Sequence, residues 1–514
     1  MENQNCRLFL EQIASWCAAK LKQYRIPAIS GILFGLLAYM FAFTNKLVNH
    51  DDVSALFSKG GTHTLGRWGL DLLEMIFPNY SMPWIYGILT IFLITVSVCI
   101  IIQIFSLQSK LFQILLAGSI LTFPSLTATL TYMFTSSSYA VSFLLAVLAV
   151  WFLTKCSKRA VLPALICMIG SLSIYQSYVA ITASLLVLVL IQCLLQEEPI
   201  LPVVKSGIFY VLFLIVSLGV YYVLTMIINR MLGTGFSSYA SGNLSFRFEE
   251  IPSRILLAYQ SFFRFFAEGF RGLMPTAFSQ LLHKLCLLFS GLLLMLWIFS
   301  QKRFQLSRVF WLAALLGILP LAINCMYLFS TEDSVHTLVL YGFIAIYVLI
   351  TVLTQAAAEL HLQFRFRQVC INLLSFLVSG IILCNTYIAN EAFLLLHLRY
   401  ENASAFYTTL AADIRMTPGF DQDTKLALTG AYQEPSFYLE KFPFSDHITG
   451  TDGFLPDVYS KDRFLEYYMG FPIPMASAEE TEEIMASPEY EQMAVYPYYG
   501  SLQKIGNTLV VKLS

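Results

Sequence analysis

The sequence predicts a polytopic all-α membrane protein with about 11 transmembrane helices, followed by a small α/β domain at its C-terminal end. Composition is the first observation: 57% of the 514 residues are hydrophobic and 12% are charged, with a mean hydropathy of +0.68. A soluble domain has roughly twice this share of charged residues. The second observation is a series of uncharged apolar runs, each near the length that a bilayer core requires. These runs lie near residues 27–45, 84–106, 111–133, 138–154, 160–175, 177–195, 206–229, 281–300, 309–330, 336–357 and 368–388.

The charges divide the chain into two parts. From residue 389 onward there are 18 Asp and Glu against 8 Lys and Arg, so this stretch carries about −10 and the rest about +9. Such a contrast indicates two differently solvated compartments. The predicted organisation is a cytoplasmic amphipathic arm at 1–26, a multi-helix membrane domain at 27–388 with outer loops at about 46–83 and 230–280, and an acidic extracytoplasmic domain at 389–514.

The basic residues of the short loops predict the orientation. Under the eleven-helix count they all fall on one side, which the positive-inside rule assigns to the cytoplasm. The N-terminus is then inside and the acidic tail outside, a split that an odd number of helices requires. The residues concerned are Lys110, the cluster Lys155 to Arg159, Lys205, the loop 301–308, and Arg365 with Arg367.

Two further segments have readable patterns. The tail predicts a helix at 400–416, a strand at 425–429, a charged helix at 477–494 and a closing strand at 507–513. Residues 251–273 combine an aromatic face with basic flanks, which is typical of a helix lying in the membrane interface. Such a helix is placed either to grip a lipid-linked substrate or to serve as a plain anchor.

The apolar runs carry no Asp, Glu, Lys or Arg in their middle. Ion-coupled transporters usually need such groups near the membrane midplane, so this pattern weighs against them and leaves a lipid flippase open. Nine of the ten cysteines lie in the N-terminal arm or the apolar runs, Cys156 lies in a short loop, and no two form a CxxC pair. This distribution favours buried apolar side chains over a metal site.

The strongest candidate for chemistry is His50-Asp51-Asp52, directly after the first apolar run. A carboxylate at an apolar–aqueous boundary has its pKa raised by desolvation and by a second carboxylate beside it, which suits a general base toward a sugar hydroxyl. The pair is also suited to holding a divalent cation that bridges a phosphate. A purely structural interpretation makes Asp52 the N-cap of a helix that begins at Val53.

Two other patches accompany this motif. The same outer loop contains His63 and Gly66-Arg67-Trp68, in which Arg67 is a phosphate-binding candidate and Trp68 either stacks on a sugar or anchors the loop in the interface. The motif from Ser173 to Tyr178 lies at the outer end of two apolar runs. Its polar groups predict either a buried site or ordinary polar packing between helices.

In this order, Asp51-Asp52, Gly66-Arg67-Trp68 and the Ser173–Tyr178 motif resemble the bacterial glucosyl transferase II family, the phage-type serotype-converting membrane glucosyltransferases. The similarity covers residues 30–390. That family is similar to the GT-C class of polyprenyl-phosphate-sugar-dependent glycosyltransferases, whose members place an acidic residue of the first outer loop in the active site. The resemblance therefore implies a GT-C-like fold in the bacterial inner membrane.

The resemblance also implies an activity, in which a hexose, with glucose the first choice, moves from undecaprenyl phosphate to an outer-surface polysaccharide or lipid-linked glycan with inversion. The implied partners are this donor, this acceptor and the lipid bilayer, with no nucleic acid. The resemblance implies no particular cofactor, and the use of a divalent cation, which Asp51 and Asp52 would hold, stays open. The implied site residues are Asp51 and Asp52 as catalytic groups; Arg67, Arg230, Arg264 and Arg271 for the donor phosphate; and His50, His63, Trp68, Tyr175, Gln176 and Tyr178 for substrate binding.

Two other classes of protein fit parts of the pattern. A polysaccharide polymerase or ligase is also a many-helix enzyme with lipid-linked substrates, but such proteins usually have a large outer loop rich in Arg and His. A flippase or transporter of lipid-linked glycans is the other alternative.

Overall fold

The structure, a computed structural model, is 76% helical with a small sheet at the C-terminal end. It describes residues 22–45, 47–57, 60–156, 158–237, 248–268, 276–300, 305–330, 335–360, 365–421, 423–432, 434, 437–442, 447–451 and 460–514. Most of the expected N-terminal arm, and Arg271, lie outside these residues.

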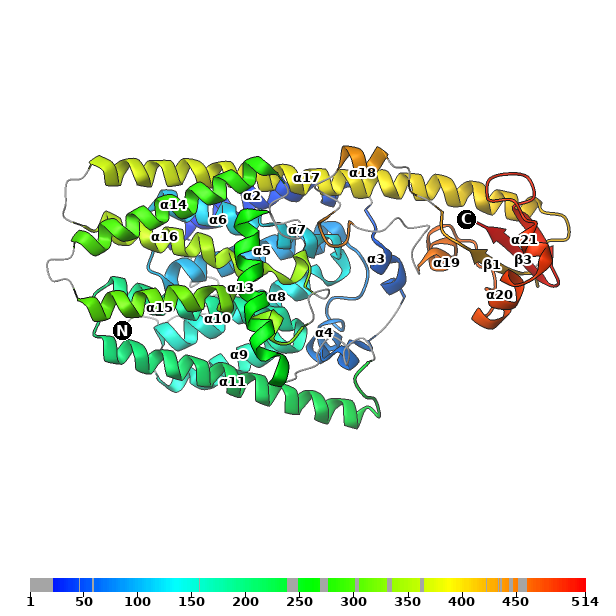
Figure 1. The fold of residues 1–514 in the computed structure, drawn as a ribbon. Helices are drawn as coiled ribbons and strands as arrows, with labels where there is room; N and C mark the ends of the chain where they lie inside the picture. The colour runs from blue at the N-terminus through cyan, green and yellow to red at the C-terminus, as the bar shows by residue number, and fades with distance from the viewer. Residues whose placement is uncertain are drawn as a thin grey trace, which may run out of the picture.

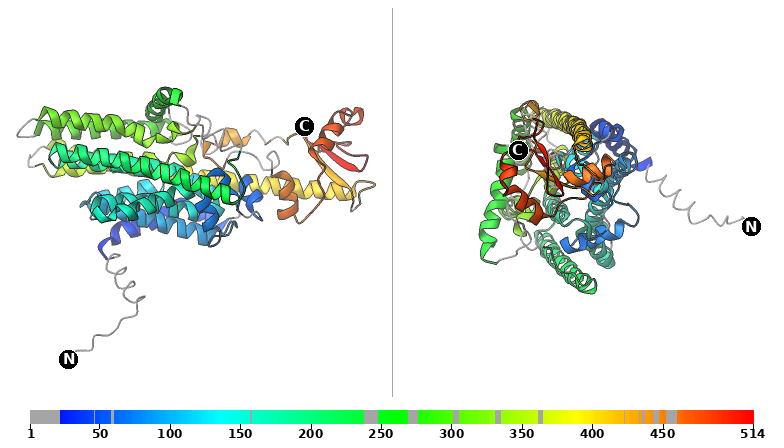
Figure 2. Two further views of the ribbon diagram at one scale, coloured as in Figure 1. Left: turned by 90° about the horizontal axis from the view of Figure 1, so that it is seen from below. Right: turned by 90° about the vertical axis from the view of Figure 1, so that its right-hand side faces the viewer.

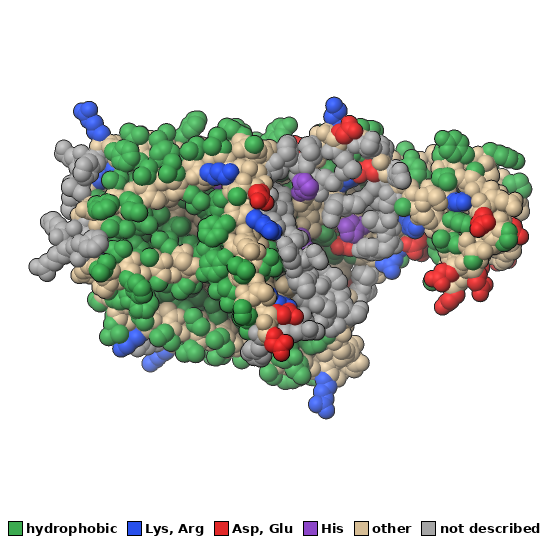
Figure 3. All heavy atoms as spheres, in the orientation of Figure 1, with side chains coloured by type: hydrophobic (Ala, Val, Ile, Leu, Met, Phe, Trp, Pro, Cys, Tyr) green, Lys and Arg blue, Asp and Glu red, His purple; other side chains and the backbone are tan. Residues whose placement is uncertain are grey.

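Within the described chain, nine helices are long and apolar enough to cross a bilayer. They lie side by side in Figure 1, and hydrophobic side chains cover this part of the molecule in Figure 3. Every expected apolar run overlaps one of these helices or the helices α6, α7 and α9 described next. The nine are α2 (Arg25–Thr44), α5 (Pro83–Ile104), α8 (Met133–Lys155), η3 with α10 (Gln176–Leu195), α11 (Ile200–Met231), α14 (Ala277–Ser300), α15 (Leu306–Ile323), η8 with α16 (Tyr341–Ala358) and α17 (Arg365–Met416).

The third expected run is broken. Helix α6 (Lys110–Leu121) and helix α7 (Pro124–Thr131) meet at an angle of 41°. Pro124 lacks an amide hydrogen and disfavours helical backbone at the residue before it, so the chain stops and starts a new helix there. Counted together the pair is a tenth candidate span, while α9 (Val161–Ile174) has only 14 residues.

Helix α17 is the longest element, with 52 residues. It covers both the last apolar run and the expected helix at 400–416, so the predicted boundary at residue 389 lies inside a continuous helix. Figure 1 shows it leaving the bundle and reaching the far end of the tail domain. The helix ends at Met416, before Pro418 and before Gly419 in the left-handed region at φ +79°.

Several short elements gather at the end of the bundle that faces the tail. They include α3 (His50–Ala55), η1 (Thr62–Leu65) and α4 (Trp68–Leu73), while α13 (Ile251–Ala267) lies farther back along the bundle. Helix α13 lies across the long helices in Figures 1 and 2. Its Phe265 ring stacks on Phe343 at 4.4 Å, so part of the expected aromatic face packs on protein. The remaining short helices are η2 (Lys158–Ala160), η4 (Phe248–Glu250), η5 (Cys325–Leu328) and η7 (Thr337–Val339).

The tail domain is built on a three-stranded sheet of order β1-β3-β2. The expected strands form as β1 (Lys425–Thr429) and β3 (Thr508–Lys512), which pair in parallel, and β2 (Leu502–Ile505) adds an antiparallel edge. The prediction of one helix at 477–494 was wrong, because Pro488 starts a second helix. The tail helices are α18 (Phe437–Lys441), α19 (Lys461–Arg463), the π-helical turn η11 (Phe464–Tyr468), α20 (Ala478–Met485) and α21 (Pro488–Glu491).

Residues 447–451, here called the docking segment, attach the tail domain to the bundle. The Thr131 hydroxyl at the end of α7 donates to the Thr449 carbonyl at 2.9 Å, and Thr337 donates to the His447 carbonyl at 3.1 Å. Ile448 is fully buried in the bundle core. Viewed along the helix axes in Figure 2, the tail domain lies over the end of the bundle.

An ion pair fixes the far end of the docking segment. Arg399 of α17 is 3% exposed, donates to the Thr451 carbonyl and pairs with Glu434, with 2.7 Å between Nη2 and Oε2. A buried ion pair of this kind defines one arrangement, because removing either partner leaves a charge without compensation.

Replacing Gly450 by alanine should weaken this docking. Gly450 and Gly500 share a φ of +88°, so alanine at either position costs about 1–2 kcal/mol of backbone strain. Only at Gly450 does the added methyl meet the Thr131 side chain, which costs about 1–3 kcal/mol more. The melting temperature in detergent should fall further for Gly450→Ala than for Gly500→Ala. Equal shifts would contradict a stabilising role of the docking segment.

Candidate functional site

Helix α3 begins with a reciprocal pair of hydrogen bonds. The Asn49 side chain accepts from the Asp52 amide at 2.8 Å, and the Asp52 carboxylate accepts from the Asn49 amide at 3.1 Å. This capping box satisfies two amides that a helix start leaves open. Asn49 also donates to the Thr131 carbonyl at 2.7 Å, which fastens α3 to the end of α7. The expectation that Asp52 is itself the N-cap was wrong: Asn49 is the cap and Asp52 completes the box.

Asp52 is a buried carboxylate, with 3% of its surface exposed. The Ser81 hydroxyl donates to its second oxygen. Burial raises the pKa of Asp52 to about 7, although hydrogen bonds from Ser81 and from the backbone amides of Asn49 and Phe134 oppose the shift. The neighbouring charge of Asp51 raises the pKa of Asp52 further. The hydrogen bonds of Asp52 therefore tie the start of α3 to Ser81.

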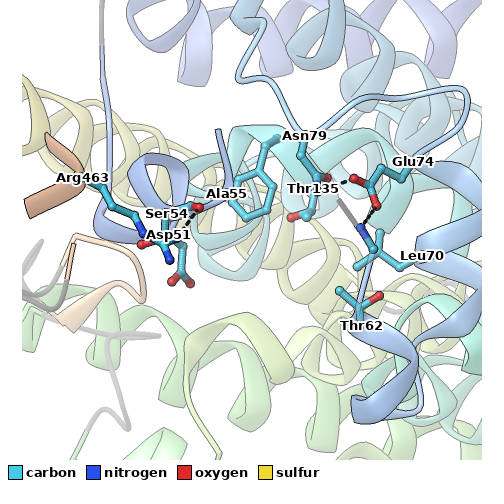
Figure 4. A pocket seen from close by; sticks show the side chains of 11 residues that line it. Asp51, Ser54, Ala55, Thr62, Leu70, Glu74, Asn79, Thr135 and Arg463 are labelled. Carbon is cyan, nitrogen blue, oxygen red and sulfur yellow. Dashed lines mark hydrogen bonds between the residues drawn. The ribbon is translucent and has the colours of Figure 1, made fainter. Parts of the chain in front are cut away.

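Asp51 has a different environment, because its side chain lines a cavity of about 300 Å³. Figure 4 shows α3 on one side of this cavity and a later part of the same loop, with Thr62, Leu70 and Glu74, on the other. A volume near 300 Å³ is at the lower end of the range for small-molecule sites. The lining residues are Asp51, Ser54, Ala55, Gly60, Thr62, Leu70, Glu74, Asn79, Phe134, Thr135 and Arg463.

The loop wall is held together by two carboxylates that the sequence analysis did not single out. Asp71 accepts from the Thr62 amide at 3.0 Å and from the His63 ring at 2.8 Å. Glu74 accepts from the Gly60 amide at 2.7 Å and from Asn79 at 2.9 Å. Both bonds of Glu74 are visible in Figure 4. These acids organise the turn from Gly60 to Thr62 that faces Asp51.

Arg67 lies in an aromatic setting behind that wall. Its amide donates to the Thr62 carbonyl at 3.0 Å, while its guanidinium lies over the Tyr175 ring at 5.0 Å and donates to Tyr139 at 3.3 Å. Tyr139 and Tyr175 stack with ring centroids 4.3 Å apart. Cation–π contact of this kind stabilises an arginine that is partly withdrawn from water.

The Ser173–Tyr178 motif does fold onto Gly66-Arg67-Trp68. Gln176 donates to the Leu65 carbonyl and to the Tyr221 hydroxyl, both at 2.9 Å, and Tyr221 donates to the Gly66 carbonyl at 2.9 Å. The Trp68 ring donates to Thr225 of α11 at 3.2 Å. Two of the three predicted patches are therefore in direct contact.

The other predicted residues lie elsewhere. His50 is beside Asp51, with 3.8 Å between Nε2 and Oδ1, and does not line the cavity. Tyr178 is 1% exposed and packs on Phe143 and Tyr341 inside the bundle. Arg230 at the end of α11 and Arg264 on α13 are exposed. None of these side chains borders the cavity.

Arg463 is the cavity residue that local sequence patterns had no means of revealing. It belongs to the tail domain, yet its Nη1 donates at 2.9 Å to the Ser54 carbonyl, 409 residues earlier in the chain. Tyr139 and Tyr221 were also missed, because an apolar run conceals which of its tyrosines face a site. Among the described residues, no group of three or more His, Cys, Asp or Glu is placed to hold a metal ion.

The long apolar helices suggest a membrane protein, and the cavity beside Asp51 is a candidate site at one end of the bundle. The model of the family "Glucosyl transferase GtrII" matches residues 40–350, which is more than half of the chain. The chain therefore belongs to this glucosyl transferase family, as its motifs predicted, and family membership implies glycosyltransferase activity. Comparisons with curated proteins and with solved structures found no match.

Asp52→Asn should lower stability and flatten its pH dependence. Because the folded-state pKa of about 7 exceeds the reference value of 3.8, the folded chain binds the proton more tightly, and the free energy of unfolding falls as pH rises between these values. Asparagine does not titrate. Its NH2 group would also face one of the groups that now donate a hydrogen bond to Asp52, at a cost of about 1–3 kcal/mol. Melting temperatures from pH 4.5 to 8 should show the gap between wild type and variant narrowing with pH. A gap that widens would contradict the raised pKa.

Proposed function

We propose that this chain transfers a hexose, in the first place glucose, from a polyprenyl-phosphate donor to a polysaccharide on the outer surface. The observation that carries the proposal is Asp51, a carboxylate on the wall of a cavity, in a chain of a glucosyl transferase family. In this proposal Asp51 is the base, because it lines the cavity, whereas the buried Asp52 holds the start of α3.

The reaction is a single displacement. The acceptor hydroxyl gives its proton to Asp51 as its oxygen forms a bond to the anomeric carbon. The bond from that carbon to the phosphate oxygen breaks, and the lipid phosphate leaves with the electron pair. Attack and departure on opposite faces of the sugar invert the configuration. A positioned general base contributes typically about 10²–10⁴-fold to such a rate.

Arg67 is the group best placed for the donor phosphate. Arginine matches phosphate oxygens in a bidentate way, and the Tyr139–Tyr175 pair holds this guanidinium where water is partly excluded. An ion contact is stronger in such a medium than in bulk water. Arg230 and Arg264 are exposed, so water weakens the attraction that either would exert on a phosphate.

An apolar groove supports a lipid-linked donor. A cavity of about 710 Å³ lies between α10, α11 and α15, and its walls are almost entirely hydrocarbon, from Leu194 and Ile200 at one end to Leu328 at the other. At this second end Leu328 packs in one cluster with Tyr221, which bonds Gly66 next to Arg67. A polyprenyl chain in the groove would bring its phosphate toward Arg67.

The ends of the helices support the proposed orientation. Lys110 begins α6, Lys155 ends α8 and Arg365 begins α17, all at the end opposite the tail domain. By the positive-inside rule that end is cytoplasmic. The cavity and the tail are then outside, where surface polysaccharides are modified.

Asp51→Asn should reduce glucose transfer at least about 100-fold, because the variant loses the proposed base. Its melting temperature should change less than that of Asp52→Asn, because Asp51 lines the cavity whereas Asp52 is buried. Transfer is measured in membranes with radiolabelled polyprenyl-phosphate glucose. Asp423→Asn, an exposed aspartate of the tail, is the matched control and should retain full activity.

Full transfer by Asp51→Asn would contradict the proposed mechanism. A deletion strain offers a separate check on the function itself. Unchanged surface glycan together with accumulated lipid-linked precursor would favour a flippase over a transferase.

Gly207→Phe should make the enzyme discriminate against long donors. Gly207 lines the groove, and a phenyl ring there fills space that the proposed lipid chain needs. The KM for undecaprenyl-phosphate glucose should rise at least about tenfold, while that for a two-isoprene donor stays near the wild-type value. Gly291→Phe on α14, where a side chain meets open space, is the control. Equal changes for both donors would count against the groove.

A further inference from the structure

The two walls of the Asp51 cavity come from different parts of the chain. Gly60, Thr62, Leu70 and Glu74 of the first outer loop form one wall. The opposite wall combines α3 with Arg463, a residue of the tail domain, and Figure 4 shows Arg463, Ser54 and Asp51 together on that side. The cavity is therefore complete only when the tail domain is in place.

Arg463 is held firmly by the tail domain. The next two residues, Phe464 and Leu465, are 0% and 2% exposed in the tail core. Two residues before it, Lys461 donates to the Leu428 carbonyl of the sheet at 3.2 Å. The guanidinium thus projects from a fixed turn toward α3.

Helix α3 is packed into the tail domain as well. Val48 and Val53, which flank Asp51, belong to the same hydrophobic cluster as Phe464. Beyond the end of α3, the Phe57 ring meets Tyr467 edge-on at 4.8 Å. The catalytic candidate Asp51 is therefore carried by a helix that bundle and tail hold between them.

This wall offers polar groups that the described chain leaves open. The Ser54 hydroxyl is buried without a hydrogen-bond partner, which is costly unless a ligand or water supplies one. Of the five donors of Arg463, one is used by the Ser54 carbonyl. A hydroxyl, a guanidinium and a carboxylate on one wall match the hydroxyl groups of a sugar.

The in-line geometry of the proposed reaction indicates whether the donor sugar or the acceptor sugar contacts the wall that carries Asp51. The base must contact the acceptor hydroxyl, and the leaving phosphate must be on the far face of the transferred sugar. Ser54 and Arg463 share the wall of Asp51, whereas the backbone of Arg67 is bonded to Thr62 on the opposite wall. The wall of Asp51 is thus the acceptor side.

We propose that the wall formed by α3 and the tail domain binds the acceptor sugar, with Arg463 and Ser54 as its ligands, so that the tail domain selects the acceptor. This rests on the proposed glucosyl transfer. The tail is then part of the active site.

The test is a comparison of acceptor and donor kinetics in the full-length protein. Arg463→Gln should raise the KM for surface polysaccharide from a deletion strain at least about tenfold, the scale of one charge-assisted hydrogen bond. The donor KM, and the slow release of free glucose from the donor without polysaccharide, should stay within about twofold, since water needs no such ligand. Lys441→Gln, an exposed lysine of the tail, is the control.

The outcomes separate this inference from the proposed function. A parallel loss of transfer and of donor hydrolysis, or an unchanged polysaccharide KM, overturns the acceptor role of Arg463. Absence of transfer by the wild-type protein overturns the proposed function itself. If Arg463→Gln unfolds, Arg463→Lys retains the charge and should show the same split between acceptor and donor to a smaller degree.

Discussion

The site depends on the hydrogen bonds that Asn49 makes at the start of α3. The Asn49 side chain accepts from the Asp52 amide, and the Asn49 backbone amide donates to the Asp52 carboxylate. These two bonds set the direction in which the helix leaves the bundle. The side-chain amide of Asn49 reaches Thr131, which also binds the docking segment of the tail. Thr131 at the end of α7 thus contacts both the helix that carries Asp51, through its carbonyl, and the domain that carries Arg463, through its hydroxyl.

Asp51 and Asp52 illustrate how adjacent identical residues acquire different roles. A helix turns about 100° per residue, so neighbours face different surroundings. Asp52 turns inward, where three donors surround it and burial raises its pKa. Asp51 turns to the cavity. In the proposed mechanism, the hydrogen bonds of the buried carboxylate hold the start of the helix from which its neighbour acts.

Much of the fold was predictable because its causes are local. Bilayer thickness sets the length of the apolar runs, and the alternation in Lys425–Thr429 and Thr508–Lys512 was sufficient to predict both strands. The break at Pro124 and the second start at Pro488 were also local signals, but they were overlooked. The continuity of α17 was not predictable from polarity, because a helix can pass from an apolar to a polar medium without a change in its own hydrogen bonds.

The site was predictable only in part for a different reason. Motif order was sufficient to pair Arg67 with Tyr175 and Gln176, since the first outer loop and a helix turn meet at the same end of a bundle. Arg463 required the fold of the tail, because nothing near it in the chain marks one arginine of an acidic domain as special. The two arginines also differ in their surroundings. Arg67 lies toward the hydrocarbon groove and Arg463 toward water, so a lipid-soluble donor and a water-soluble acceptor would reach Asp51 from opposite sides.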